Sequence, residues 1–323
     1  MKKSVVFILC MVVGLSMALS GCGAAKVNLI MATGGTSGTY YPFGGALAQI
    51  FNTKIENMNV TAQSTGASSE NLRLIGKGEA ELAIVQNDVM DYAYNGEELF
   101  NVDGQKEVIE GFRTIATLYP EVIQIVVSPE SGINSVADMK GKRISVGDAG
   151  SGVEANAKQI LEAYGLTFDD IKVSRLSFKE SANAYKDKQL DGFFVTAGVP
   201  NSAIQEITAL SEVRIISIDD ATTEKLIDKH PYYTKYTISK DTYNGMTEDA
   251  TTVAVKATLI AKKDLDDEVV YNLTKALFEN QEELAAAHAK GKELNINEAV
   301  EGVSVPFHPG AEKYYKEKGV LKD

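Results

Sequence analysis

The chain has 323 residues, of which 44% are hydrophobic and 8% aromatic, the composition of a folded globular protein rather than a disordered one. With 44 acidic against 32 basic residues, it carries a formal net charge of −12. This charge excludes a protein that binds nucleic acid through clustered lysine and arginine. The length predicts two compact units, and we expect a monomer.

The first 21 residues have the layout of a secretory signal. Lys2 and Lys3 precede an apolar stretch from Val5 to Leu19, which is too short to span a bilayer of ~30 Å comfortably. The stretch ends in Leu19-Ser20-Gly21-Cys22, which resembles the bacterial lipobox. We therefore expect residues 1–21 to be removed and Cys22 to carry a lipid anchor. Losing the two lysines takes the net charge to −14.

Only two cysteines occur in the sequence, Cys10 and Cys22. Since Cys10 lies in the signal, the mature chain keeps Cys22 alone and cannot form an internal disulfide. A chain of this length can be stabilised by its hydrophobic core.

Strand and helix patterns alternate from residue 27 onward. Val27 to Ala32 is a strand pattern that runs into a glycine-rich loop, and a helix follows with Pro42 in its first turn. Val60 to Ala62 and Ala83 to Val85 are two further strand patterns, with a helix through Leu72 between them. This alternation predicts βαβ units around a parallel sheet.

The same pattern returns roughly 110 residues later along the chain. A strand at Ile144 to Val146 is followed by the loop Gly147 to Gly152 and a helix from Glu154 to Tyr164. Strands at Val173 to Leu176 and Phe193 to Val195 come next, with a helix between them. Two similar units in tandem predict an α/β fold with two Rossmann-like lobes.

Two segments are predicted to cross between the lobes. Thr114 to Val127 is strand-rich with Pro120 at its centre, and a second crossing is expected near Arg214 to Ile238. The expected division is 22–119 with about 220–323 in lobe I, and about 120–219 in lobe II. The strand pattern from Thr252 to Lys262 and the later helices should then pack back on lobe I.

Glycine and hydroxyl residues follow the strands in both lobes. Ligands of open α/β sheets bind at the carboxyl ends of strands. Glycine allows close backbone approach, and a helix N-terminus presents N–H groups that suit an anion. Such a cradle needs no cationic side chain, and no arginine lies in these loops. The arginines are Arg73, Arg113, Arg143, Arg175 and Arg214.

Several runs of residues resemble the TAXI family of solute receptors, which serve TRAP transporters. These runs are Ala32 to Pro42, Ser64 to Ser68, Leu118 to Glu121, Val146 to Gly152, Asp191 to Gly198 and His308 to Gly310. The resemblance extends from about Val27 to Gly319. It implies the periplasmic-binding-protein type II fold, with hinge strands, a ligand in the cleft and an integral membrane permease as partner. It also implies a small anionic solute such as glutamate, 2-oxoglutarate or another carboxylate.

The resemblance points to candidate ligand-binding positions at the strand ends of both lobes. For Tyr40 and Tyr119, ordinary packing is the alternative. The candidates are Gly35, Thr36, Ser37, Gly38, Tyr40, Ser64, Thr65, Gln86, Tyr119, Ser151, Gly152 and Thr196.

Two other functions remain as alternatives. The receptor of an ABC importer shares the expected fold, so the fold does not separate it from a TRAP receptor. A dinucleotide-binding enzyme is suggested by Gly150-x-Gly152-x-x-Ala155, but the next strand ends in Leu176-Ser177-Phe178 where an acidic residue is needed. The three histidines lack metal-ligand spacing. We therefore expect a protein without catalytic activity, cofactor or bound metal.

Overall fold

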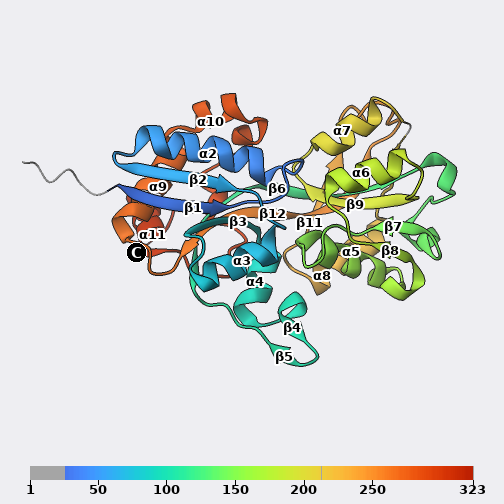
Figure 1. The fold of residues 1–323 in the computed structure, drawn as a ribbon, viewed down its shortest axis with the longest axis horizontal. Coiled ribbons are helices and arrows are strands. Elements are labelled where there is room, and N and C mark those ends of the chain that lie inside the picture. The colour runs from blue at the N-terminus through green and yellow to red at the C-terminus, as the bar shows by residue number, and fades with distance from the viewer. Residues whose placement is uncertain (1–25, 212, 323) are drawn as a thin grey trace, which may run out of the picture.

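The computed structural model describes residues 26–211 and 213–322. The signal segment and Cys22, with the predicted lipid anchor, lie outside the described residues. Figure 1 shows two lobes side by side, joined through strands at the centre of the molecule. Among the described residues, no helix is long and apolar enough to span a membrane.

The first lobe is built on three parallel strands in the order β2-β1-β3. These are β1 (Val27–Ala32), β2 (Met58–Gln63) and β3 (Leu82–Gln86). Helices α2 (Tyr40–Lys54) and α3 (Ser68–Lys77) connect them, and α4 (Asn87–Asn95) follows. The expected strands and helices are therefore confirmed, and β1 has the predicted bounds.

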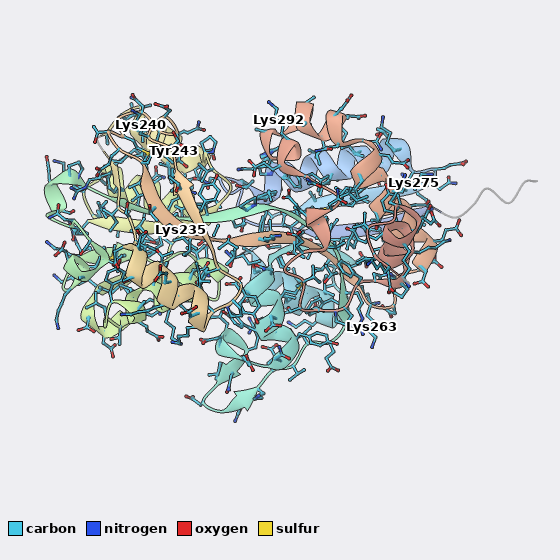
Figure 2. The ribbon with its side chains drawn as sticks, turned by 180° about the vertical axis from the view of Figure 1, so that it is seen from behind. Lys235, Lys240, Tyr243, Lys263, Lys275 and Lys292 are labelled. Carbon is cyan, nitrogen blue, oxygen red and sulfur yellow. The ribbon has the colours of Figure 1, made fainter. Side chains whose placement is uncertain are left out.

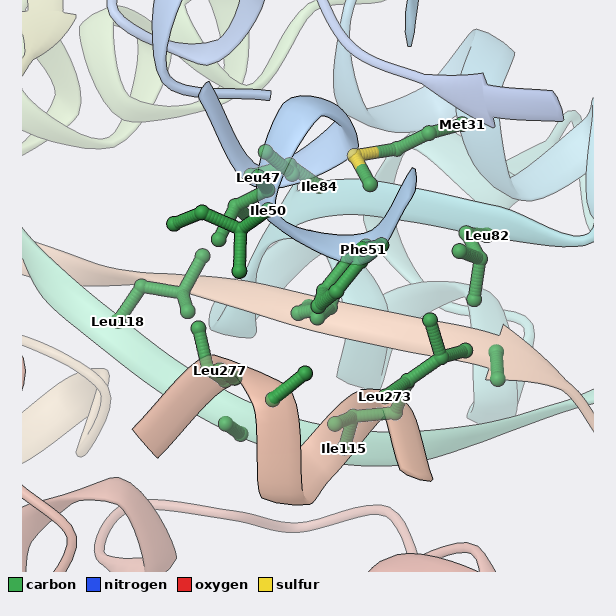
Figure 3. Close-up of a cluster of buried hydrophobic side chains, with 14 of the residues drawn as sticks. Met31, Leu47, Ile50, Phe51, Leu82, Ile84, Ile115, Leu118, Leu273 and Leu277 are labelled. Carbon is green, nitrogen blue, oxygen red and sulfur yellow. The ribbon is translucent and has the colours of Figure 1, made fainter. Parts of the chain in front are cut away.

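The core of this lobe brings the two ends of the chain together. Leu47, Ile50 and Phe51 of α2 are buried against Leu273 and Leu277 of α9 (Asp267–Glu279), as Figure 3 shows. Burying one such side chain contributes ~1.5–3 kcal/mol. Helices α10 (Gln281–Ala287) and α11 (Pro309–Glu317) join the same cluster. The return of the C-terminal helices to the first lobe is thus confirmed.

The second lobe repeats the arrangement, with strand order β8-β7-β9. Its parallel strands are β7 (Arg143–Ser145), β8 (Lys172–Ser174) and β9 (Gly192–Ala197). Its helices are α5 (Gly152–Ala163), α6 (Phe178–Lys186) and α7 (Ser202–Thr208). Matching strand orders place the ends of β1 and β7, and the glycine-rich loops after them, at equivalent positions in the two lobes.

Two long strands cross between the lobes, β6 (Phe112–Val127) and β12 (Ala250–Lys262). The first half of β6 pairs with β12, and its second half pairs with β9. Strand β12 pairs with β11 (Thr234–Ile238) at one end and with β3 at the other. The crossing expected near Thr114 to Val127 is therefore present, but the second crossing is β12 and not the segment from Arg214 to Ile238.

That segment packs within the second lobe instead. It comprises β10 (Arg214–Ile215), α8 (Asp220–Lys229) and β11. Leu226 and Tyr233 are buried in the cluster that holds Ile160 and Phe194. We therefore propose that the second lobe extends to about residue 250, beyond the boundary near 220 that the sequence led us to expect.

The remaining elements are short. Strands β4 (Asn101–Val102) and β5 (Gln105–Lys106) form a hairpin that projects from the first lobe in Figure 1. Single turns of 3-10 helix lie at Glu98–Phe100, Pro129–Ser131, Val136–Met139, Phe168–Asp170, Ala289–Glu293 and Glu298–Val300.

Candidate ligand-binding cleft

A cavity of about 50 Å³ lies where the two lobes meet. This volume exceeds the ~10–15 Å³ that a cavity needs to hold one water molecule. The first lobe and β6 contribute Gly34, Gly35, Ser37, Gly38, Thr39, Tyr40, Ala67, Ser68, Gln86 and Glu121. The second lobe contributes Asp148, Ser151, Gly152, Val153, Ser177, Phe178, Thr196 and Ala197. A solute in this cavity would touch both lobes at once.

The glycine-rich loop of the first lobe is bound directly by the second lobe. The backbone N–H of Gly198 donates to the Thr39 hydroxyl over 3.1 Å. The Ser37 carbonyl accepts from the Asn201 amide over 3.3 Å and from the Ser202 hydroxyl over 3.0 Å. The segment after β9 therefore ties the loop between β1 and α2 to the second lobe.

The glycine-rich loop of the second lobe starts helix α5. Gly147 and Gly150 have φ values of 90° and 74°, which side chains other than glycine rarely adopt. The Ser151 hydroxyl caps the helix by accepting from the Glu154 backbone N–H over 3.2 Å. A Cβ on Gly152 would lie 1.5 Å from Oε1 of Gln86 in the other lobe. A side chain at this position would therefore displace the Gln86 side chain from its place between the lobes.

Asn156 of α5 joins the two lobes behind the cavity, and its side chain is fully buried. Its amide donates to Asp88 over 2.9 Å and to the Tyr233 hydroxyl over 3.0 Å. Its carbonyl oxygen accepts from Gln86 over 3.3 Å and from Thr196 over 3.1 Å. Gln86 and Thr196 also line the cavity. Asn156 therefore connects the cavity wall to the hydrogen bonds that join the two lobes.

Tyr233 extends this network. Its hydroxyl donates to Gln159 over 2.6 Å, and the Gln159 amide donates to the Tyr92 hydroxyl over 2.9 Å. Burial raises the pKa of Asp88 to about 6, and the hydrogen bond from Asn156 opposes that rise. Burying polar groups is costly unless they are hydrogen-bonded to one another. This network therefore favours the one arrangement of the two lobes in which its members are paired.

A buried carboxyl group, that of Glu121, lines the cavity from β6. Only 3% of this residue is exposed. Burial raises the pKa of Glu121 to about 8, with Asp88 adding to the rise, while Tyr40, Lys290 and Gln86 oppose it. The Glu121 carboxyl is therefore largely protonated at neutral pH.

Eight of the twelve predicted ligand-binding residues line this cavity. They are Gly35, Ser37, Gly38, Tyr40, Gln86, Ser151, Gly152 and Thr196. Their contact with a ligand remains a prediction.

The other four predicted residues, Thr36, Ser64, Thr65 and Tyr119, do not line the cavity. Ser64 donates to the Gly34 carbonyl, and Thr65 donates to Asn71 over 2.6 Å, so both brace loops next to the site. Tyr119 packs edge-on against Phe43 in the first-lobe core. This is the ordinary packing role that the sequence analysis gave as the alternative to ligand binding. It also borders a separate small cavity beside Lys256 and Glu293.

Sequence reasoning missed Glu121, Asp148, Asn156 and Phe178. A signal existed for Glu121, because it is a charged residue in the middle of an otherwise apolar strand pattern and ends the run Leu118 to Glu121. For Asn156 there was none, since a polar residue on a helix is ordinarily read as facing solvent.

No lysine, arginine or histidine is among the residues that line the cavity. Arg143 pairs with Asp191 and Arg175 with Glu154, both outside it. Figure 2 shows labelled lysines on both lobes, with Lys235 and Lys240 on one and Lys263 on the other. Within residues 26–211 and 213–322, no group of three or more His, Cys, Asp or Glu side chains is arranged to hold a metal ion.

Comparison with solved structures identifies the fold. A protein from Bordetella bronchiseptica RB50 superposes with a TM-score of 0.56 at 17% identity, covering 92% of this chain and 90% of that one. A periplasmic transporter gives 0.54 at 15% identity, with 93% and 95% covered. A binding protein component of an ABC phosphonate transporter from Pseudomonas aeruginosa gives 0.51 at 13% identity, with 82% and 79% covered.

These likenesses establish the α/β fold of periplasmic binding proteins, as the sequence predicted. The family model of the NMT1-like family matches residues 31–319, which is most of the chain. The finer resemblance to TAXI receptors stays a prediction. The chain therefore belongs to the NMT1-like family.

Proposed function

We propose that this protein is an extracytoplasmic receptor that captures a small polar solute between its lobes and delivers it to a membrane permease. The observation that carries the proposal is the cavity at the lobe interface, whose wall combines strand-end residues of both lobes. A receptor of this kind binds and releases its solute unchanged. We therefore propose no catalytic role and no cofactor.

Capture would proceed by closure of the two lobes around the solute. Within the described part of the chain, β6 and β12 are the two strands that carry the sheet between the lobes, so a change in their twist would move one lobe against the other. The hydrogen bonds at Ser37 and Thr39 and the network around Asn156 form in the closed state. A solute that contacts both walls would favour this state over the open one.

Carboxylates such as glutamate and 2-oxoglutarate are the solutes we propose to test first. The start of α5 presents its backbone N–H groups at Gly152 and Val153, which line the cavity. The corresponding loop before α2 lies opposite. An oxyanion could be held by these groups without a cationic side chain.

For the permease, an ABC importer is the first candidate. It is supported by the structural likeness to the binding protein of an ABC phosphonate transporter. A TRAP permease is the second candidate, supported by the sequence runs that resemble TAXI receptors. The two differ in their energy source, which gives a direct test.

The experiment starts with purified protein. Native mass spectrometry would identify any solute that co-purifies, and calorimetric titration would measure its affinity. Uptake of that solute by cells lacking this gene should fall to background. Uptake that survives collapse of the ion gradient but not ATP depletion indicates an ABC importer, and the reverse indicates a TRAP transporter. Conversion of the solute by the purified protein would refute the proposal.

We also propose that Cys22 anchors the mature protein to the outer face of the cell membrane. Covalent acyl chains bind a membrane with ~0.8 kcal/mol per buried CH₂. Intact-mass analysis of membrane-extracted protein should show a terminus at Cys22 with added acyl mass. Cys22→Ala should abolish both. A mature terminus at any other residue would contradict the anchor.

A further inference from the structure

The cavity wall is rich in hydrogen-bond acceptors and has no fixed cation. Two carboxyl residues line it, Glu121 from β6 and Asp148 from the loop before α5. Burial raises the pKa of Asp148, and the neighbouring Glu180 and Glu70 add to the rise. Burial disfavours the ionised form of both carboxyl groups, and a cationic ligand beside them would offset that unfavourable desolvation.

Glu121 has two further polar groups beside it. The side chains of Tyr40 and Gln86 lie close enough to lower the pKa of Glu121. The Tyr40 hydroxyl and Oε1 of Gln86 are buried and make no hydrogen bond of normal geometry with any described residue. Tyr40 is 6% exposed and Gln86 is 2% exposed, and both line the cavity. Buried polar atoms are almost always paired, so unpaired ones at a cavity point to a missing ligand group.

An ammonium group matches this set of atoms. It donates three hydrogen bonds and accepts none. The Glu121 carboxylate, Oε1 of Gln86 and the Tyr40 oxygen are three acceptors, supplied by β6, β3 and α2. A ligand carboxylate has no donors to give them. Beside Glu121 it would find as donors only the Tyr40 hydroxyl and the Glu121 carboxyl in its protonated form.

We propose that Glu121 is the specificity-determining residue of the cavity and selects a solute that carries a protonated amine, with Gln86 and Tyr40 as the other acceptors. The inference rests on the proposed function and narrows it. A 2-oxo acid, which lacks the amine, is bound much more weakly than the amino acid of the same carbon skeleton.

The proposal predicts the direction of proton exchange on binding. The charged and titratable groups that face Glu121 are Asp88 from α4, Lys290 from Ala289–Glu293, Tyr40 from α2 and Tyr119 from its own strand. A ligand cation beside the carboxyl lowers its pKa, so it loses its proton on binding. From a pKa of about 8, this releases about 0.9 proton at pH 7. A ligand carboxylate there would keep the proton on Glu121, so no proton would be released and at most about 0.1 proton would be taken up.

The experiment uses pairs of solutes that differ only in the amine. The probes are glutamate with 2-oxoglutarate, alanine with pyruvate, and leucine with its 2-oxo acid, screened by thermal shift. The best binder is then titrated calorimetrically at pH 7 in two buffers of different ionisation enthalpy. We expect the amino acid to bind at least 30-fold more tightly than its 2-oxo acid and to release close to one proton.

Glu121→Gln keeps the shape of the side chain and removes the charge. It should weaken binding of the amino acid at least 10-fold, abolish proton release, and leave the 2-oxo acid unaffected. Glu206→Gln, which changes the net charge equally on exposed α7, is the matched control and should bind as the wild type does. Thermal melts of both variants confirm that they fold.

Two results would contradict this inference without contradicting the proposed receptor function. One is a 2-oxo acid that binds as tightly as its amino acid, or an amino acid that binds without proton release. The other is a co-purified solute, identified by native mass spectrometry, that contains no amine. If no probe binds and no solute co-purifies, the proposed capture of a solute fails, and this inference fails with it.

Discussion

The two glycine-rich loops occupy equivalent positions in the two lobes, but their glycines meet different constraints. In the first loop, a Cβ on Gly35 would meet nothing within 4 Å, and one on Gly38 would lie 3.2 Å from a carbonyl oxygen. Neither residue has a positive φ. In the second loop, Gly147 and Gly150 have positive φ, and a Cβ on Gly152 would collide with Gln86.

The difference shows that composition alone misleads about what a glycine does. Both loops were expected to use glycine so that a ligand could approach the backbone. In the second loop, the close approach at Gly152 is made by the other lobe, through Gln86. The second loop is therefore the part of the site that limits closure, while the first has room for side chains.

Gly152→Val should have the largest effect on binding. Its side chain would displace Gln86, a residue of the cavity wall, and press on Val89, whose Cγ2 lies 3.0 Å from the Cβ position, so the approach of the lobes is hindered. We expect at least a 10-fold loss of affinity, which corresponds to ~1.4 kcal/mol. Calorimetric titration with the co-purified solute measures this loss, and small-angle scattering of the saturated protein should give a larger radius of gyration than the wild type.

Gly35→Ala is the matched control in the first loop, where a methyl group meets open space. It should bind within about 2-fold of the wild type, well below the tenfold step of ~1.4 kcal/mol. Equal losses at Gly35 and Gly152 would break the distinction between the loops and favour a role for both in ligand contact.

Gly147→Ala should have the next largest effect, and it should act on stability. Its φ of 90° strains any L-residue by ~1–2 kcal/mol, and the new Cβ would lie 2.6 Å from Cβ of Val153. We expect a loss of ~2–3 kcal/mol in the free energy of unfolding, measured by denaturant titration.

Gly150→Ala separates these two causes. Its φ is 74° and nothing lies within 4 Å of its Cβ position, so it should lose only the backbone part, ~1–2 kcal/mol. A larger loss at Gly150 than at Gly147 would contradict the geometry described here.

Ser151→Ala should cost about 1 kcal/mol of stability, because it removes the cap of α5. Its effect on affinity should be smaller than that of Gly152→Val, since the backbone N–H groups at the helix start remain. Ser37→Ala is the comparison in the first loop. Only the Ser37 carbonyl is bound by the second lobe, so loss of its hydroxyl should leave closure unchanged.

Arg143→Ala should have the smallest effect on binding. Arg143 pairs with Asp191 at 2.6 Å and donates to the Lys188 carbonyl, and it does not line the cavity. We expect unchanged affinity by calorimetry. If Arg143→Ala abolishes binding while Gly152→Val binds normally, the backbone cradle is wrong and an arginine clamp should replace it.

The sequence by itself determined the alternating elements of each lobe and their repetition. Apolar periodicity and the loops that end each strand are local properties, so β1, β7 and α5 were predicted close to their observed bounds, and α2 was predicted with Pro42 near its first turn. The same local signals located the strand ends, and eight of the proposed site residues therefore line one cavity.

Only the tertiary structure decided which distant residues meet. Periodicity could not show that Tyr233 joins the core of the second lobe, so the second crossing was placed one segment too early. Nor could it show that Glu121 is buried beside Tyr40, or that Asn156 of one lobe pairs with Asp88 of the other. These contacts arise from the packing of segments far apart in the chain. A pattern read along one segment records which face is apolar, but not which partner covers it.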